Sequence, residues 1–150
     1  MELKLPPVIV FFVFGLLMFL LNKFLPFGFF DFFGRLLMVK VLAGIAVGVL
    51  AIAIFQFFIT KTTVDPGNPA KVRQLVTNGL YKFSRNPMYL AMLLMLLAWG
   101  LKLGNAFNVL LASGFVYYMN RFQIIPEEQI LGRKFGKEYM KYVTKTRRWF

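Results

Sequence analysis

The side chains that could take part in chemistry gather in two short polar segments, one on each side of a pair of apolar runs. The first segment holds Arg85, Asn86 and Tyr89, and the second holds Glu127 and Glu128. An arginine binds a carboxylate through two parallel hydrogen bonds, and a glutamate can hold an ammonium group or the hydroxyls of a ribose. A tyrosine ring can flank an adenine or a positively charged sulfonium. Together, these residue types suit a ligand that is zwitterionic and partly aromatic.

The residue types that are missing narrow the chemistry further. The sequence contains no histidine and no cysteine, which excludes thiolate nucleophiles, imidazole bases and the usual zinc sites. We therefore expect no metal site. S-adenosylmethionine carries every group that the two polar segments could bind, and methyl transfer from its sulfonium needs alignment of donor and acceptor rather than a metal or a covalent intermediate. Residue spacing alone leaves the cofactor open.

Each of these residues also has a purely structural interpretation. Arg85 suits the end of a membrane span, and Pro87 suits the first turn of a helix. Glu127 and Glu128 suit a helix N-terminus, where acidic groups interact favourably with the helix dipole. Both glutamates lie about one helical turn before Leu131, on the face expected to dock, and an acid turned toward a bundle usually has a basic partner. Arg85 is the partner that we expect.

The elements that must position these residues belong to a membrane protein. Of the 150 residues, 59% are hydrophobic, 18% are aromatic and only 16% are charged, and a soluble domain of this size could not bury so much apolar surface in one core. We therefore predict an all-α, polytopic membrane protein with about four transmembrane helices and a C-terminal amphipathic helix on the cytoplasmic side. The predicted spans of this single membrane domain are residues 8–25, 36–59, 87–101 and 107–123. A cytoplasmic loop, residues 60–86, and a C-terminal helix and tail, residues 124–150, complete it.

The distribution of basic residues predicts how the chain is oriented in the bilayer. Lys23, Arg35, Lys40 and Lys102 lie toward one side, whereas the remaining fourteen of the eighteen lysines and arginines lie toward the other. The more basic side is expected to be cytoplasmic. Both termini should therefore be cytoplasmic, in an integral, multi-pass membrane protein. Orientation in the bilayer accounts for the net charge of +12, so we expect a lipid bilayer and not a nucleic acid as the partner.

A tight hairpin connects the two spans that carry the polar segments. Only four residues, 102–105, follow the apolar run 87–101 before the next apolar run begins. A turn this short makes the two helices antiparallel, so the start of one helix lies beside the end of the other. The two polar segments should therefore meet in one pocket at the inner leaflet.

Two glycines in the second span are a packing signal. Gly44 and Gly48 lie four residues apart and so share one face of the helix, where their small size permits close approach of another helix. We expect this face to pack within the bundle, ahead of the alternative that it forms a dimer. The oligomeric state stays open.

The polar segments and the residues that follow them resemble the integral membrane methyltransferases, which include isoprenylcysteine carboxyl methyltransferases and phospholipid N-methyltransferases. The resemblance covers roughly the C-terminal half of the chain. It runs through Gly79-Leu-Tyr81, Arg85-Asn-Pro87-Met-Tyr89, Glu127-Glu128-x-x-Leu131, Phe135-Gly136-x-x-Tyr139-x-x-Tyr142 and Arg148-Trp149. The order and separation of these motifs make the resemblance specific.

The resemblance implies that S-adenosylmethionine lies in a pocket formed by the last transmembrane hairpin and the C-terminal helix. This pocket would open to the cytosol, and a lipophilic substrate would enter from the bilayer. Arg85, Asn86, Glu127 and Glu128 then correspond to catalytic groups. The residues that correspond to cofactor-binding groups are Gly79, Tyr81, Arg85, Pro87, Tyr89, Glu127, Glu128, Leu131, Tyr139, Tyr142 and Arg148.

One residue departs from the family's pattern. The family motif often reads Arg-His-Pro-x-Tyr, whereas Asn86 stands at the middle position here. Asparagine can donate and accept hydrogen bonds but cannot titrate. An amine acceptor that needs a base would therefore depend on Glu127 or Glu128, whereas a carboxylate or thiolate acceptor would need none.

The sequence therefore predicts an S-adenosylmethionine-dependent methyltransferase with a lipophilic acceptor. The acceptor stays open among a prenylcysteine carboxylate, a phospholipid amine and a small hydrophobic thiol or isoprenoid. The alternative from another class is a non-catalytic membrane module, such as a transporter subunit or a lipid-binding scaffold, whose basic face holds anionic headgroups.

Overall fold

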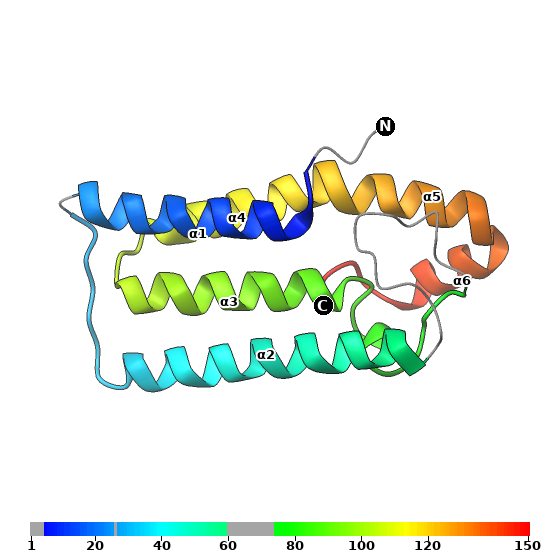
Figure 1. Cartoon of the computed structure of the whole chain (residues 1–150), viewed down its shortest axis with the longest axis horizontal. Helices are drawn as coiled ribbons and strands as arrows, with labels where there is room; N and C mark the ends of the chain where they lie inside the picture. The colour runs from blue at the N-terminus through cyan, green and yellow to red at the C-terminus, as the bar shows by residue number, and fades with distance from the viewer. Residues whose placement is uncertain (1–4, 26, 60–73) are drawn as a thin grey trace.

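The structure, a computed structural model, describes residues 5–25, 27–59 and 74–150, and within these ranges the regular elements are all helices. The all-α class predicted from the sequence is therefore confirmed. Figure 1 shows helices α1 to α4 lying side by side along the longest axis of the molecule. Their bounds are Pro7–Phe24 for α1, Arg35–Ile59 for α2, Pro87–Leu103 for α3 and Asn108–Met119 for α4. Part of the predicted cytoplasmic loop, residues 60–73, lies outside the described residues.

Helices α1 and α2 have the length and the apolar composition needed to cross a membrane. Many of their large apolar side chains are exposed, among them Phe12 with 66% and Phe55 with 63% of its surface accessible. A soluble protein rarely exposes so much apolar surface, so these two helices are consistent with a membrane protein. Helix α3 is also apolar but shorter, with 17 residues. These three helices fall within one or two residues of the ranges that the sequence predicted for the first three spans.

Helix α4 is joined without a loop to the helix that carries the two glutamates. Helix α4 continues through a π-helical turn, η3 (Asn120–Ile124), directly into α5 (Ile125–Phe135) (Figure 1). Pro126 follows this turn, and a proline in a regular helix loses a hydrogen bond and collides with the carbonyl four residues earlier. The wider π turn accommodates that collision. The chain therefore stays helical across residue 123, the end of the predicted fourth span, and α5 begins one residue after the predicted start of the C-terminal helix.

The C-terminal amphipathic segment forms two helices, so the prediction of one helix is wrong. Helix α5 ends at Phe135, and α6 (Lys137–Lys145) folds back toward the bundle (Figure 1). Gly136, between them, has a φ of +49°, in the region that favours glycine because it has no Cβ. The helical spacing of apolar residues continues across this glycine, which is why the pattern alone did not reveal the break.

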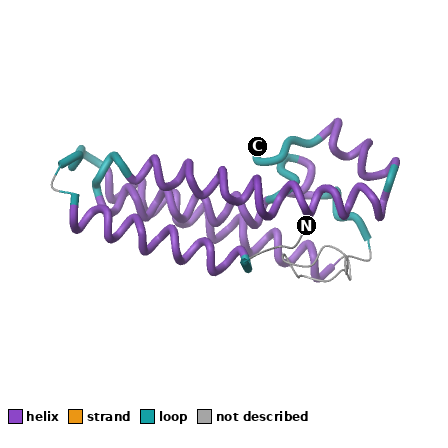
Figure 2. The backbone as a smooth tube through the Cα atoms, turned by 90° about the horizontal axis from the view of Figure 1, so that it is seen from above, coloured by secondary structure: helices purple, strands orange, loops and turns teal. Residues whose placement is uncertain are grey.

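The tight hairpin between α3 and α4 is present as predicted. Gly104 ends α3 with a left-handed backbone at a φ of +71°. The buried side chain of Asn105 donates to the Phe27 carbonyl (Nδ2 to O, 3.1 Å) and accepts from the N–H of Phe107 (N to Oδ1, 3.0 Å). Figure 2 shows this hairpin at one end of the bundle, away from the C-terminal segment. The start of α3 and the end of α4 are therefore neighbours at the other end.

Two buried clusters hold the helices together. The first joins α1, α3 and α4 through Met18, Leu96 and Phe115, each with at most 1% of its surface exposed. The second joins α2, α3 and α6 to a short 3-10 helix, η2 (Gly79–Lys82). Its buried members are Ala53, Val76, Tyr81, Met88, Tyr139 and Tyr142. This second cluster supports the polar residues at the end of the bundle where α5 and α6 lie.

The small-residue face of α2 does not pack as expected. A methyl group added at Gly44 or Gly48 would meet no described atom within 4 Å. The alanines that turn inward are Ala46 and Ala53, with 1% and 0% of their surface exposed. Since Gly44 and Ala46 are two residues apart, they point to nearly opposite sides of the helix. The expectation that the two glycines pack within the bundle is therefore wrong.

Candidate active site

The two polar segments meet at the ends of the hairpin helices. Arg85 and Tyr89 stand at the start of α3, and Glu127 and Glu128 stand in the first turn of α5. Arg85 Nη2 lies 2.8 Å from Glu128 Oε1. The Tyr89 hydroxyl donates a hydrogen bond of 2.5 Å to Glu127 Oε1. The structure thus brings together the arginine, the tyrosine and the two carboxylates, as the short turn predicted.

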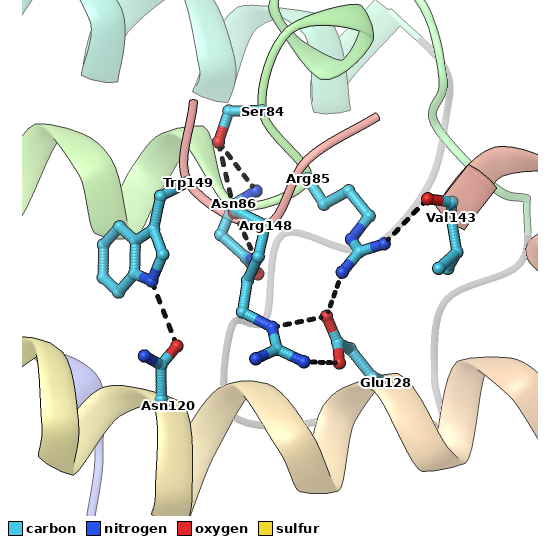
Figure 3. A network of polar contacts seen from close by, with 8 residues as sticks. All are labelled: Ser84, Arg85, Asn86, Asn120, Glu128, Val143, Arg148 and Trp149. Carbon is cyan, nitrogen blue, oxygen red and sulfur yellow. Dashed lines mark hydrogen bonds and ion pairs between the residues drawn. The ribbon is translucent and has the colours of Figure 1, made fainter. Parts of the chain in front are cut away.

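A second arginine, from the C-terminal tail, completes the ion pair. Arg148 donates from Nε to Glu128 Oε1 at 3.0 Å and from Nη2 to Glu128 Oε2 at 2.6 Å. Figure 3 shows Arg85 and Arg148 both pointing at this one carboxylate. The side chains of Arg85 and Glu128 are 10% and 19% exposed, and that of Arg148 is 36% exposed. A carboxylate so far removed from water is stabilised chiefly by the charged donors around it.

The C-terminal tail docks on the segment that leads into α3. The backbone N–H of Arg85 donates to the Arg147 carbonyl at 2.9 Å. The side-chain amide of Asn86 donates to the Arg148 carbonyl at 2.9 Å (Figure 3). Asn86 was predicted as a catalytic group, and the structure places its amide where it holds the tail. The Asn86 side chain therefore orients Arg148 indirectly, through the backbone of the tail.

Sequence reasoning missed two further residues that position the tail. Ser84 is buried, and its hydroxyl donates to the Arg148 carbonyl of the tail at 3.5 Å and accepts a hydrogen bond from the Asn86 N–H at 3.2 Å. The indole N–H of Trp149 donates to Asn120 Oδ1 at 3.0 Å (Figure 3). Asn120 lies in the π turn, so this bond ties the tail to the helix that carries both glutamates. The signal for Asn120 was an amide within an apolar run, where a polar side chain needs a partner.

A layer of aromatic side chains lies behind the ion pair. The Tyr142 hydroxyl donates to the Tyr81 carbonyl at 2.6 Å, and the rings of Tyr139 and Tyr142 pack edge to face with centroids 6.3 Å apart. Leu131 packs against the same cluster. Burial raises the pKa of Tyr139 to about 12 and also raises the pKa values of Tyr81 and Tyr142. These tyrosines are therefore neutral and act through packing and hydrogen bonds.

Gly79 and Pro87 shape the backbone that presents Arg85. Gly79 has a φ of +60°, and a Cβ there would lie 1.4 Å from Gln56 Nε2. The Gln56 side-chain carbonyl accepts a hydrogen bond from the N–H of Leu80 at 3.2 Å. Pro87 is fully buried and begins α3, a position where its missing N–H costs no helical hydrogen bond. Gly79 thus fixes the path of the chain at the start of η2, and Pro87 fixes it after η2.

The two glutamates have different electrostatic environments. Burial raises the pKa of Glu127 to about 8, the hydrogen bond from Tyr89 acts in the opposite direction, and the charge of Glu128 adds to the increase. Hydrogen bonds with Glu128 raise the pKa of Arg148. Glu128 forms ion pairs with Arg85 and Arg148, and Glu127 has a raised pKa that lets it exchange a proton near neutral pH. The two glutamates can therefore serve separate roles.

The donor set also shows what could be held here. Arg85 Nε is buried and has no hydrogen-bond partner among the described residues. Two guanidinium groups, two carboxylates and a phenol match the carboxylate, ammonium and hydroxyl groups of a zwitterionic nucleoside. The described part of the chain has no group of three or more acidic, histidine or cysteine side chains placed to hold a metal ion. The charged and hydroxyl groups of the site fit an organic cofactor with complementary groups.

Comparison with known proteins identifies the family. The phospholipid methyltransferase family matches residues 36–138 of this chain, which is more than half of its 150 residues. The chain belongs to the phospholipid methyltransferase family. The sequence resemblance to the integral membrane methyltransferases is thereby confirmed. The range of this chain that matches the family includes Arg85, Tyr89 and both glutamates, but it ends before Arg148.

One relative of this family member comes from Haemophilus influenzae and is described as an uncharacterized protein. The two sequences are 52% identical over 62 residues, which cover 41% of this chain and 98% of the relative. No solved structure matches this chain. The geometry of the ion pair and of the docked tail therefore rests on the present structure.

Proposed function

We propose that this chain is an S-adenosylmethionine-dependent methyltransferase that acts on a lipophilic acceptor at the cytoplasmic face of a membrane. The observation that carries the proposal is the convergence of Arg85, Tyr89, Glu127 and Glu128 from two helix ends at one place. Family membership supports the same reaction, because the family is one of methyltransferases. The strongly basic end of the bundle supports the cytoplasmic orientation.

The cofactor's amino-acid part is expected to bind at the arginine and glutamate ion pair. Its carboxylate would pair with Arg85, whose Nε is buried without a partner among the described residues. Its ammonium group would pair with Glu128, whose two oxygens are held in place by Arg85 and Arg148. Binding would then exchange part of an internal ion pair for an equivalent one with the cofactor, so the buried charges remain compensated throughout.

The remaining residues of the site would orient the reactants. When bound, S-adenosylmethionine supplies an electrophilic methyl group on a positively charged sulfonium. Tyr89 lies beside Glu127 in the first turn of α3, where its ring can flank that positive charge. Glu127, with its pKa raised to about 8, is suited to accept the proton of an amine acceptor, because a base works best when its pKa is near the ambient pH.

The acceptor class that these observations favour is a phospholipid amine. The family description names phospholipids, and an amine is the acceptor that makes use of a base such as Glu127. A prenylcysteine carboxylate and a small hydrophobic thiol or isoprenoid are the other acceptors, and of these a carboxylate or an already ionised thiolate could react without a base. The exposed apolar surface of α1 and α2 would give any of them a path through lipid. Comparing methyl incorporation from labelled S-adenosylmethionine into each class separates these acceptors.

The experiment that tests the site is calorimetric titration of the detergent-solubilised protein with S-adenosylhomocysteine. We expect the native chain to bind, and Arg85→Ala and Glu128→Ala to lose binding. Arg133→Ala is the matched control, because Arg133 is an exposed arginine on the same helix α5. Circular dichroism checks that each variant keeps its helices, and the milder Arg85→Lys and Glu128→Gln replace any variant that does not. Unchanged binding in both site variants would refute the assignment.

A further inference from the structure

A pocket beside α6 is lined by Tyr142 of the aromatic layer and by several charged side chains. It has a volume of about 410 Å³ and is formed by the segment that leads into η2 and by one side of α6. Its lining residues are Thr77, Asn78, Lys82, Glu138, Lys141, Tyr142, Lys145 and Thr146. Figure 1 shows how α6 folds back to reach this segment. None of the charged residues in this lining belongs to the proposed methyl-transfer site.

Positive charge dominates this pocket. Lys82, Lys141 and Lys145 contribute three ammonium groups to the lining, and Glu138 contributes a single carboxylate. Lys141 and Lys145 are four residues apart on α6, so they share one side of that helix. Three like charges around one cavity repel each other, and a multiply charged anion removes that repulsion. Lysine ammonium groups are common ligands of phosphate, which they bind as point charges.

The floor of the pocket is built before any ligand arrives. The Thr146 hydroxyl donates to the Lys82 carbonyl at 3.3 Å, and the Tyr142 hydroxyl donates to the Tyr81 carbonyl at 2.6 Å. Thr146 and Tyr142 are 6% and 9% exposed. Both hydrogen bonds join the C-terminal segment to η2, so the two walls that carry the lysines are fixed relative to one another. A site that is already ordered loses less entropy when it binds a ligand.

We propose that this pocket binds a phosphate group. The source is either the headgroup of a membrane phospholipid or a soluble phosphate, and the recognition is the same for both: one phosphate among Lys82, Lys141 and Lys145. This site goes beyond the proposed methyl transfer, because it uses none of the groups assigned to the cofactor's charged ends. It also stands independently of that reaction, since charge and shape alone carry it.

The test measures binding of two probes to the full-length protein in a neutral detergent. The probes are inorganic phosphate and short-chain dihexanoylphosphatidylglycerol. Lys141→Gln combined with Lys145→Gln removes two charges from the pocket. Lys102→Gln combined with Lys137→Gln is the matched control, because it removes the same charge from exposed lysines that do not line the pocket. We expect the pocket variant to weaken binding about tenfold or more, because two of the three ammonium groups that face the phosphate are lost, and the control to bind like the native chain.

The two probes separate the sources. Binding of the lipid but not of inorganic phosphate, lost in the pocket variant, assigns the site to a phospholipid headgroup. Binding of both probes, lost in the same variant, assigns it to phosphate in general.

Glu138→Gln adds a gain-of-function arm, because removing the single carboxylate should tighten binding and a folding defect could not do so. Equal weakening in the pocket variant and the control, or no binding by the native chain, would overturn the proposal. We expect S-adenosylhomocysteine to bind equally well to the native chain and to all of these lysine and Glu138 variants. A failure of the phosphate proposal can therefore be told apart from a failure of the methyltransferase proposal.

Discussion

Arg148 binds the carboxylate of Glu128 through two parallel hydrogen bonds, from Nε to Oε1 at 3.0 Å and from Nη2 to Oε2 at 2.6 Å. Arg85 approaches the same carboxylate from α3, with its Nη2 at 2.8 Å from Oε1. Two segments more than 60 residues apart in the chain, one before α3 and one in the tail, thus meet on a side chain of α5. This arrangement fixes the rotation of the Glu128 carboxylate, and a cofactor would meet it already oriented.

The first prediction concerns the second of these arginines. Arg148→Lys keeps the positive charge but cannot form two parallel hydrogen bonds. Losing one charge-assisted hydrogen bond costs about 1.5 kcal/mol, so S-adenosylhomocysteine should bind about tenfold more weakly in calorimetric titration. Arg147→Lys is the control, because Arg147 is exposed and uses its backbone carbonyl to hold Arg85. Equal affinities of the two variants would show that the bidentate geometry has no part in binding.

The second prediction concerns the proton on Glu127. The hydrogen bond from Tyr89 lowers the pKa of Glu127 against the larger effect of burial, which leaves it at about 8. Tyr89→Phe removes that hydrogen bond, so the pKa should rise further. With an amine acceptor the base must be ionised, and methyl-transfer rates in Tyr89→Phe should therefore start to increase at a higher pH than in the native enzyme. Tyr117→Phe is the control, because Tyr117 is an exposed tyrosine of α4, and it should keep the native pH profile. If Tyr89→Phe also keeps the native pH profile, Glu127 is not the base.

The third prediction is a dependence of stability on pH. The ordinary pKa of the Glu127 carboxyl is 4.5, and in the folded chain burial raises this pKa to about 8. Between these values the folded state holds a proton that the unfolded state has released, so stability is highest below about 4.5 and declines as the pH rises through 8. Glu127→Gln should flatten this decline in thermal unfolding midpoints measured across the range. The same slope in native and variant proteins would place the titrating group elsewhere.

The sequence was sufficient for the features that depend on local composition and short spacing. The apolar runs located α1, α2 and α3, because a long stretch of apolar residues with very few charges has few alternatives to a membrane-type helix. The four residues around Gly104 predicted the hairpin, and the hairpin in turn predicted that Arg85 would reach Glu128. Here one local feature determines a contact between residues that are 43 positions apart.

The features that escaped prediction depend on tertiary packing. The spacing of apolar residues shows neither the π turn between α4 and α5 nor the break after Phe135. Gly136 was nevertheless a signal for the end of a helix, because glycine often follows the last helical residue. The docking of the tail depends on hydrogen bonds to backbone carbonyls, which no residue pattern encodes. The inward face of α2 depends on which side of the helix meets α3, so alanines took the place that Gly44 and Gly48 were expected to fill.

The fourth prediction tests whether η2 must keep its backbone for the site to form. Gly79 has a φ of +60°, and an alanine Cβ would overlap the side chain of Gln56. A left-handed backbone costs a non-glycine residue about 1–2 kcal/mol, so Gly79→Ala should lower the unfolding midpoint and weaken S-adenosylhomocysteine binding, since Arg85 follows η2 closely. The matched substitution Gly44→Ala lies on an open face of a regular helix, where alanine is favoured over glycine by up to about 1 kcal/mol. Gly44→Ala should therefore keep or raise the unfolding midpoint, whereas a loss there would indicate that another chain packs against that face.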